Sequence, residues 1–227
     1  MEIRIKKNQE DMENTNKKSW RDISINEYYE IKDIIDDSTL KDYEKEVSIL
    51  SLLTNKSEDE IWNMNVNNFK KLKSENIWIY NFNFDKGKSF KKIEIKGNKY
   101  NIDININNMT VAQYVDFQTY WLQRDNMKNI IGNLLAIFII PKGKKYNEGY
   151  DINQVVNDIM NNIDIMTAEE ILFFFLSSYL ISIKITLNYL NLKMKMIKIM
   201  KKDKEKVEKF QKEIMNLEKI ISDGFIL

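Results

Sequence analysis

The chain of 227 residues is long enough to bury a hydrophobic core, as one large domain or two small ones. It contains no cysteine and no histidine, which excludes thiolate chemistry and removes the side chain that ordinarily titrates near neutral pH. Its 35 basic and 34 acidic residues leave a net charge of +1, so no global field draws the chain onto nucleic acid.

The sequence offers no phosphate-binding motif and no distinctive acid–base pair. Gly143 and Gly149 have almost the spacing of a P-loop, but no Lys-Ser/Thr pair follows them. Carboxylates that could form a metal or glycosidic site are Asp33, Asp36, Asp37, Asp116 and Asp158. Their spacing is that of surface charges or helix caps. We therefore predict a protein that is not an enzyme and uses no cofactor or metal.

The N-terminal third of the chain divides at residue 22. Residues 1–22 are polar and charged, lack the apolar core of a signal peptide and predict a flexible arm. Residues 23–75 predict a helical unit, because apolar residues recur there at helical spacing. Its helices are expected over residues 25–35, 40–53 and 58–63.

Capping boxes mark four helix starts in the chain. In each box a hydroxyl accepts a hydrogen bond from a backbone N–H three residues on, and a Glu or Gln side chain reaches back to the cap. The boxes are Ser24 with Glu27, Ser57 with Glu60, Thr110 with Gln113, and Thr167 with Glu170.

The hydrophobic period changes to two in residues 76–108, which predicts a three-stranded antiparallel meander. The first strand would place its aromatic residues on one face: Trp78, Tyr80, Phe82 and Phe84. The second and third strands, over residues 90–96 and 99–106, would be joined by a hairpin turn at Gly97-Asn98.

Residues 109–192 predict a helical core, which a loop over residues 142–150 interrupts. Helices are expected from Thr110, over residues 127–140 and 152–162, and from Ala168 onwards. The longest apolar runs cover residues 130–140 and 171–183. Both are shorter than the roughly 17 to 25 residues that cross a bilayer, so no membrane span is predicted.

Residues 193–227 predict a long amphipathic C-terminal helix with an apolar seam of the coiled-coil type. The seam consists of Met196, Met200, Val207, Phe210, Ile214, Leu217 and Ile221. Lysines on this helix could follow a phosphate backbone, but the acidic residues between them favour an ordinary solvated face. The aromatic face of residues 78–84 could likewise stack on bases, but it lacks interleaved basic residues, which favours packing.

Three segments resemble small virion or tail-assembly proteins of tailed phages that infect Bacteroides. They are MTVAQYVDFQTYW (109–121), LLAIFIIPKGKKYNEGYD (134–151) and AEEILFFFLSSYL (168–180). The richness in Asn, Lys and Ile is similar to that of crAss-like phages. The resemblance implies a component of the head-tail machinery, such as a ring or connector subunit, a cargo protein or a tail-assembly chaperone.

We thus predict an α+β, predominantly helical fold, namely a helical bundle with a three-stranded antiparallel sheet and a long C-terminal helix. The expected function is that of a homo-oligomeric virion protein, made in the host cytoplasm, whose partners are portal, ring and tail proteins. The aromatic strand face, the 142–150 loop and the C-terminal seam are its expected interfaces. Alternatives are a cytoplasmic tail-assembly chaperone and, third, an accessory protein that binds nucleic acid.

Overall fold

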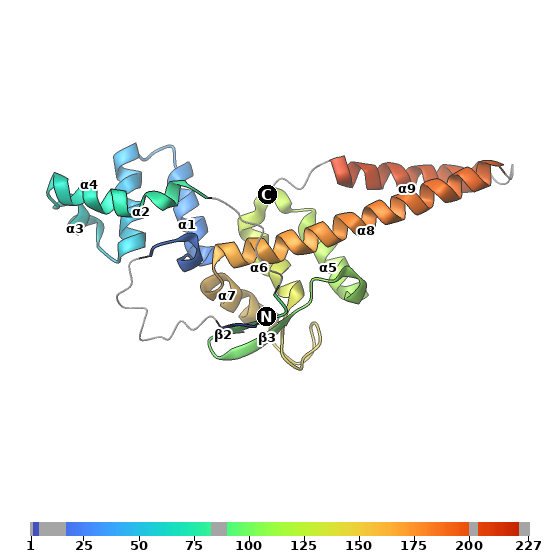
Figure 1. Cartoon of the computed structure of the whole chain (residues 1–227), viewed down its shortest axis with the longest axis horizontal. Coiled ribbons are helices and arrows are strands. Elements are labelled where there is room, and N and C mark those ends of the chain that lie inside the picture. Colours follow the sequence, from blue (N-terminus) through green and yellow to red (C-terminus); the bar gives the residue numbers. More distant parts are fainter. Residues whose placement is uncertain (1, 5–16, 83–89, 200–203, 223–227) are drawn as a thin grey trace. The chain divides into compact units, whose positions relative to one another are not determined.

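The computed structural model describes residues 2–4, 17–82, 90–199 and 204–222 (Figure 1). It confirms the fold class, because helices predominate and accompany a small antiparallel sheet and a long helix near the C-terminus. The chain forms two compact units. Unit 1 consists of Met1–Asp103 and Met109–Ile171, and unit 2 of Ile104–Asn108 and Leu172–Leu227.

Four helices form the N-terminal part of unit 1: α1 (Ile25–Asp36), α2 (Asp42–Thr54), α3 (Glu58–Trp62) and α4 (Val66–Glu75). The first three match the prediction, and the capping boxes that begin α1 and α3 are both formed. Helix α4 was not predicted separately, although Asn65 caps it by accepting a hydrogen bond from the Asn68 N–H. Helices α2, α3 and α4 share a core of Val47, Leu50, Ile61 and Leu72.

The sheet contains four described strands in the order β1 (Glu2–Arg4), β2 (Lys92–Ile95), β3 (Asn98–Ile102) and β4 (Ile139–Pro141). Strands β2, β3 and β4 are antiparallel, and β1 adds parallel to β2. Residues 2–4 of the expected flexible arm therefore form an edge strand. The hairpin turn is Lys96–Gly97, one residue earlier than predicted, with φ of 49° and 80°. Positive φ at both central residues is typical of a type I′ turn.

The predicted strand that carries the aromatic face is wrong over the residues that the structure describes, 77–82. Ile77–Tyr80 forms the 3-10 helix η3, which directly follows α4. The Ile79 N–H donates to the Asn76 carbonyl, and the Asn81 N–H donates to the Trp78 carbonyl. Apolar side chains occupy consecutive positions here, so the period-two pattern was ambiguous. The third antiparallel strand of the sheet is instead β4, whose first two residues were predicted to end the helix over residues 127–140.

Helices α5 (Val111–Trp121), α6 (Met127–Phe138) and α7 (Ile152–Asn162) follow the predicted order. The Thr110 capping box begins α5 as expected. Helix α6 ends at Phe138, two residues before the predicted end, because a residue that precedes a proline disfavours the helical region. Short 3-10 turns lie at Trp20–Asp22 (η2), Ile106–Asn108 (η4) and Arg124–Asn126 (η5).

Helix α8 (Ile165–Ile199) begins three residues earlier than predicted. The Asp164 carboxylate accepts hydrogen bonds from the Thr167 N–H at 2.9 Å and the Thr167 hydroxyl at 2.7 Å. The predicted Thr167 box is therefore wrong, because Asp164 caps the helix and Glu170 is buried. Of the predicted C-terminal helix, residues 193–199 belong to α8 and Lys204–Ser222 form α9, and residues 200–203 lie outside the description (Figure 1).

Close contact between α6 and α7 generates the first prediction. A Cβ at Gly132 would lie 2.9 Å from both Met160 Cγ and Val156 Cγ1. We expect Gly132→Ala to lower the free energy of unfolding by about 1–3 kcal/mol, although alanine favours helix more than glycine. Urea denaturation measures the loss. In the Val156→Ala background the loss should shrink, and equal losses in both backgrounds would contradict the steric explanation.

Candidate interaction surface

Several of the carboxylates that the sequence offered as a metal or glycosidic site have separate local partners. No group of three or more Asp or Glu side chains that could hold a metal ion occurs among the described residues. Asp33 pairs with Lys128, Asp37 accepts from Thr39, and Asp116 accepts from Tyr146. Each of these carboxylates thus has its own local partner.

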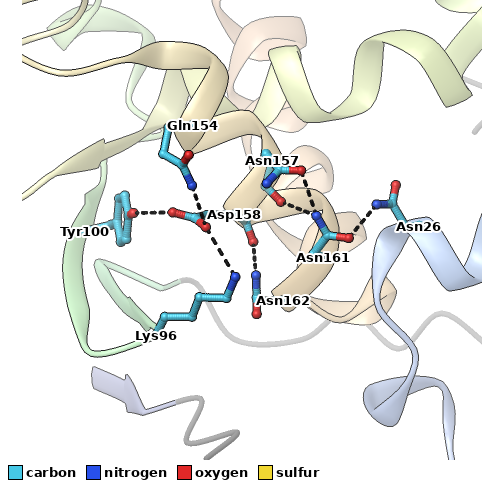
Figure 2. A network of polar contacts seen from close by, with 8 residues as sticks. All are labelled: Asn26, Lys96, Tyr100, Gln154, Asn157, Asp158, Asn161 and Asn162. Atoms are coloured by element: carbon cyan, nitrogen blue, oxygen red, sulfur yellow. Dashed lines mark hydrogen bonds and ion pairs between the residues drawn. The ribbon is translucent and has the colours of Figure 1, made fainter. Parts of the chain in front are cut away.

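Asp158 lies at the centre of a polar network between α7 and the β2–β3 turn (Figure 2). Its side chain is buried and lies 3.5 Å from the Tyr100 hydroxyl, 3.2 Å from Gln154 Nε2 and 3.6 Å from Lys96 Nζ. Burial, followed by the nearby Asp158 charge, raises the pKa of Tyr100. These contacts hold the hairpin against α7, so we assign the network to the fold.

A second buried carboxylate, Glu170, ties the second turn of α8 to η2. It is completely buried, and its Oε1 accepts a hydrogen bond of 2.6 Å from Arg21 Nη2. Its Oε2 has no hydrogen-bond partner among the described residues. Because an unpaired buried charge is costly, Arg21 is the contact on which this carboxylate depends.

The predicted aromatic face does not exist as one surface. Trp78 and Phe82 pack against Trp20, with ring centroids 5.7 and 5.2 Å apart and nearly perpendicular planes. Tyr80 is exposed, and Phe84 lies outside the described residues. Two of the predicted interface residues therefore have ring contacts within unit 1, although Phe82 is still 38% exposed.

An open apolar groove lies instead between α2, α3 and α4, and we call it the α2–α4 groove. It encloses about 170 Å³. Its lining consists of Tyr43, Val47, Ile61, Trp62, Met64, Val66 and Phe69. Val47 and Ile61 are buried at its base, whereas Tyr43, Trp62 and Val66 are 48%, 51% and 66% exposed at its rim.

The rim of the α2–α4 groove is held by aromatic contacts. The Tyr43 and Trp62 rings meet edge to face, with centroids 5.7 Å apart. Lys41 Nζ lies 5.7 Å from the centre of the Tyr43 ring. Exposed tryptophan and tyrosine beside a pocket are typical of residues that dominate protein interfaces. Both residues lie on helices that the sequence predicts, over 40–53 and 58–63, but nothing in the sequence marks them as a rim.

Unit 2 exposes a second apolar feature on α8, which we call the α8 row. It consists of Ile181, Ile185, Tyr189 and Leu192, each 58–64% exposed. Steps of four, four and three residues place these side chains on one helix face. Lys193 Nζ lies 5.4 Å from the centre of the Tyr189 ring.

The predicted C-terminal seam is only partly described. Ile214 of α9 is buried and Leu217 is half-buried. Met196, Val207, Phe210 and Ile221 lie on helices, but their side chains are outside the description, and Met200 is outside it altogether. The seam as an interface therefore stays a prediction.

Two hydrogen bonds, from Lys142 and Tyr146, attach the 142–150 loop to the rest of unit 1. The Lys142 N–H donates to the Lys99 carbonyl at 2.8 Å, which extends the pairing beside β4. Tyr146 is buried, and its hydroxyl donates to Asp116 Oδ2 of α5 at 2.8 Å. Burial and this hydrogen bond raise the pKa of Tyr146. The loop thus presents its exposed lysines on a defined backbone.

The apolar stretch of α8 is longer than the predicted apolar run over residues 171–183. Among the described residues, the stretch Ile165–Met194 is long and apolar enough to cross a membrane by length and composition alone, and 39% of its apolar window is buried. Core helices of soluble proteins meet the same criterion, so this evidence is weak. The predicted absence of a membrane span stays a prediction.

Comparison of the chain with family models, curated proteins and solved structures found no match. The α2–α4 groove and the α8 row are therefore identified from their exposure and shape. Both are apolar surfaces of the kind that binds protein.

The buried Glu170 carboxylate gives a stability prediction. Arg21→Ala would leave the Glu170 carboxylate buried without its cation. We expect the free energy of unfolding to fall by about 3 kcal/mol, the lower end for a buried ion pair, because solvent screens the half-exposed Arg21. Lys128→Ala is the control, since it removes an ion pair with Asp33 in which both side chains are half-exposed and should cost less than about 1 kcal/mol. Equal losses in urea denaturation would contradict this role of Glu170.

Glu169 gives a prediction about pH. Burial raises the pKa of Glu169, so its charged form destabilises the fold. Stability should fall as pH rises from the ordinary glutamate pKa of about 4.3 through the raised value. Glu169→Gln should therefore stabilise the protein at about pH 7, and the gain should vanish near pH 4.

The control for Glu169→Gln has the opposite sign. Hydrogen bonds from the Ser57 backbone and side chain lower the pKa of Glu60, so its charge stabilises the fold above the ordinary pKa. Glu60→Gln should lose stability at neutral pH and approach the parent protein in acid. If both variants changed with pH in the same direction, the assignment of Glu169 would be wrong.

Proposed function

We propose that the chain is a structural or cargo component of a phage virion, in the head-tail region, and that it acts by binding other proteins. The observation that carries the protein-binding part is the α2–α4 groove, with Tyr43 and Trp62 half-exposed at its rim. The virion part rests on the three segments, at 109–121, 134–151 and 168–180, that resemble phage head-tail proteins.

The free energy of burying apolar side chains supports a binding role for the α2–α4 groove. Fully burying a large apolar side chain contributes about 1.5–3 kcal/mol, and the folded chain gains only part of this at Trp62 and Val66, which are 51% and 66% exposed. A bound partner would recover that free energy. The buried carboxylates Asp158 and Glu170 form ion pairs within unit 1, with Lys96 and Arg21.

The test is quantitative peptide mass spectrometry of gradient-purified phage particles. We expect the protein in particles at a fixed ratio to the portal for a ring subunit, or at a higher, unrelated number for cargo. Absence from particles together with abundance in infected lysate would overturn the proposal in favour of an assembly chaperone.

Truncation after Leu192 tests the part assigned to the C-terminal helices. We expect the truncated protein to enter particles poorly, because the apolar seam of residues 196–221 would be missing. Circular dichroism of the purified truncated protein controls for loss of folding. Normal incorporation would show that these helices do not mediate assembly.

A further inference from the structure

The α2–α4 groove and the α8 row are both apolar surfaces of the described residues. The groove is an apolar hollow with an aromatic rim, and the row is a line of apolar side chains along one helix face. A helix that places residues at steps of three and four into an apolar groove is a common mode of recognition. The two surfaces belong to different units of the chain.

Their charges are also complementary. Residues 42–75, which form α2 to α4 around the groove, contain seven acidic residues and five lysines, and three of the acidic residues are consecutive in α3, at 58–60. Glu58 and Asp59 are exposed and lie four and three positions before Trp62, so they share its helix face. Residues 171–202, which contain the α8 row, include six lysines and no acidic residue. The acidic fringe therefore favours a basic apolar helix as the occupant of the groove.

We propose that the α8 row of one copy docks into the α2–α4 groove of a second copy. Ile185 and Tyr189 would enter the hollow over Val47 and Ile61, beside the Tyr43–Trp62 ring pair, and Lys184 would approach the carboxylates of Glu58 and Asp59. This inference deepens the proposed virion role and rests on it only for its biological setting. Because the two surfaces differ, the contact is head to tail and generates a ring or a chain of subunits.

The first experiment measures association of the purified full-length protein by sedimentation velocity over a range of concentrations. We expect concentration-dependent oligomers that weaken as salt rises. Trp62→Ala in the groove and Ile185→Glu in the row should each weaken association at least about tenfold. Val111→Glu is the matched control, because Val111 is 81% exposed on α5 and belongs to neither surface.

Mixing the two variants separates a head-to-tail contact from other modes. The Trp62→Ala protein keeps an intact row, and the Ile185→Glu protein keeps an intact groove. Their equimolar mixture should therefore form a one-to-one pair that grows no further. Thermal melts followed by circular dichroism would show that each variant is folded.

Three outcomes would overturn the inference. One is a monomer at all concentrations, and another is association that Trp62→Ala leaves unchanged. The third is binding of the monomer to vesicles of phosphatidylcholine and phosphatidylglycerol that Ile185→Glu abolishes, which would assign the row to a membrane surface. A monomer that still enters phage particles would overturn this inference alone, whereas absence from particles would overturn the proposed function alone.

Discussion

Helix α6 is buried from Ile130 to Phe138, apart from a half-buried Asn133. Helices α5 and α7 and strand β4 all contact this helix. Gly132 allows α7 to approach one side closely. On α5, the buried Gln113 donates to the Ile137 carbonyl at 2.8 Å, which satisfies a backbone group that the end of α6 leaves unpaired. Strand β4 leaves the same end and pairs with β3, so one apolar helix positions both the sheet and its neighbouring helices.

The N-terminal helices are joined to this core by backbone contacts and by ion pairs, one of which links Asp33 of α1 to Lys128 of α6. The Ile25 N–H donates to the Ile163 carbonyl, and the Ile165 N–H donates to the Ile23 carbonyl. Arg21 adds the ion pair with the buried Glu170. The backbone contacts cross more than a hundred residues of sequence, and they fix the start of α1 beside the end of α7. The α2–α4 groove thus lies on a part of unit 1 whose own core is complete.

Local signals in the sequence predicted the features that local physics determines. Ser24, Ser57 and Thr110 cap helices because each hydroxyl meets an N–H only three residues away. Thr167 has the same pattern, yet Asp164 caps first, and Glu170 is drawn instead to Arg21, which lies far away in sequence. The segment 77–80 failed for a related reason. A strand needs a partner strand, and short-range spacing cannot show that β4 would take the place beside β3.

The candidate site could be predicted less well than the fold, because exposure depends on which other elements cover a side chain. The sequence predicted an interface role for Trp78 but not for Trp62. Trp78 packs on Trp20, which precedes it by 58 residues, whereas α3 is only five residues long and buries just one of its two large apolar side chains. Ile61 therefore enters the core shared by α2, α3 and α4, and Trp62, the next residue, must face outward at the groove. The shortness of α3 thus creates the exposed aromatic rim.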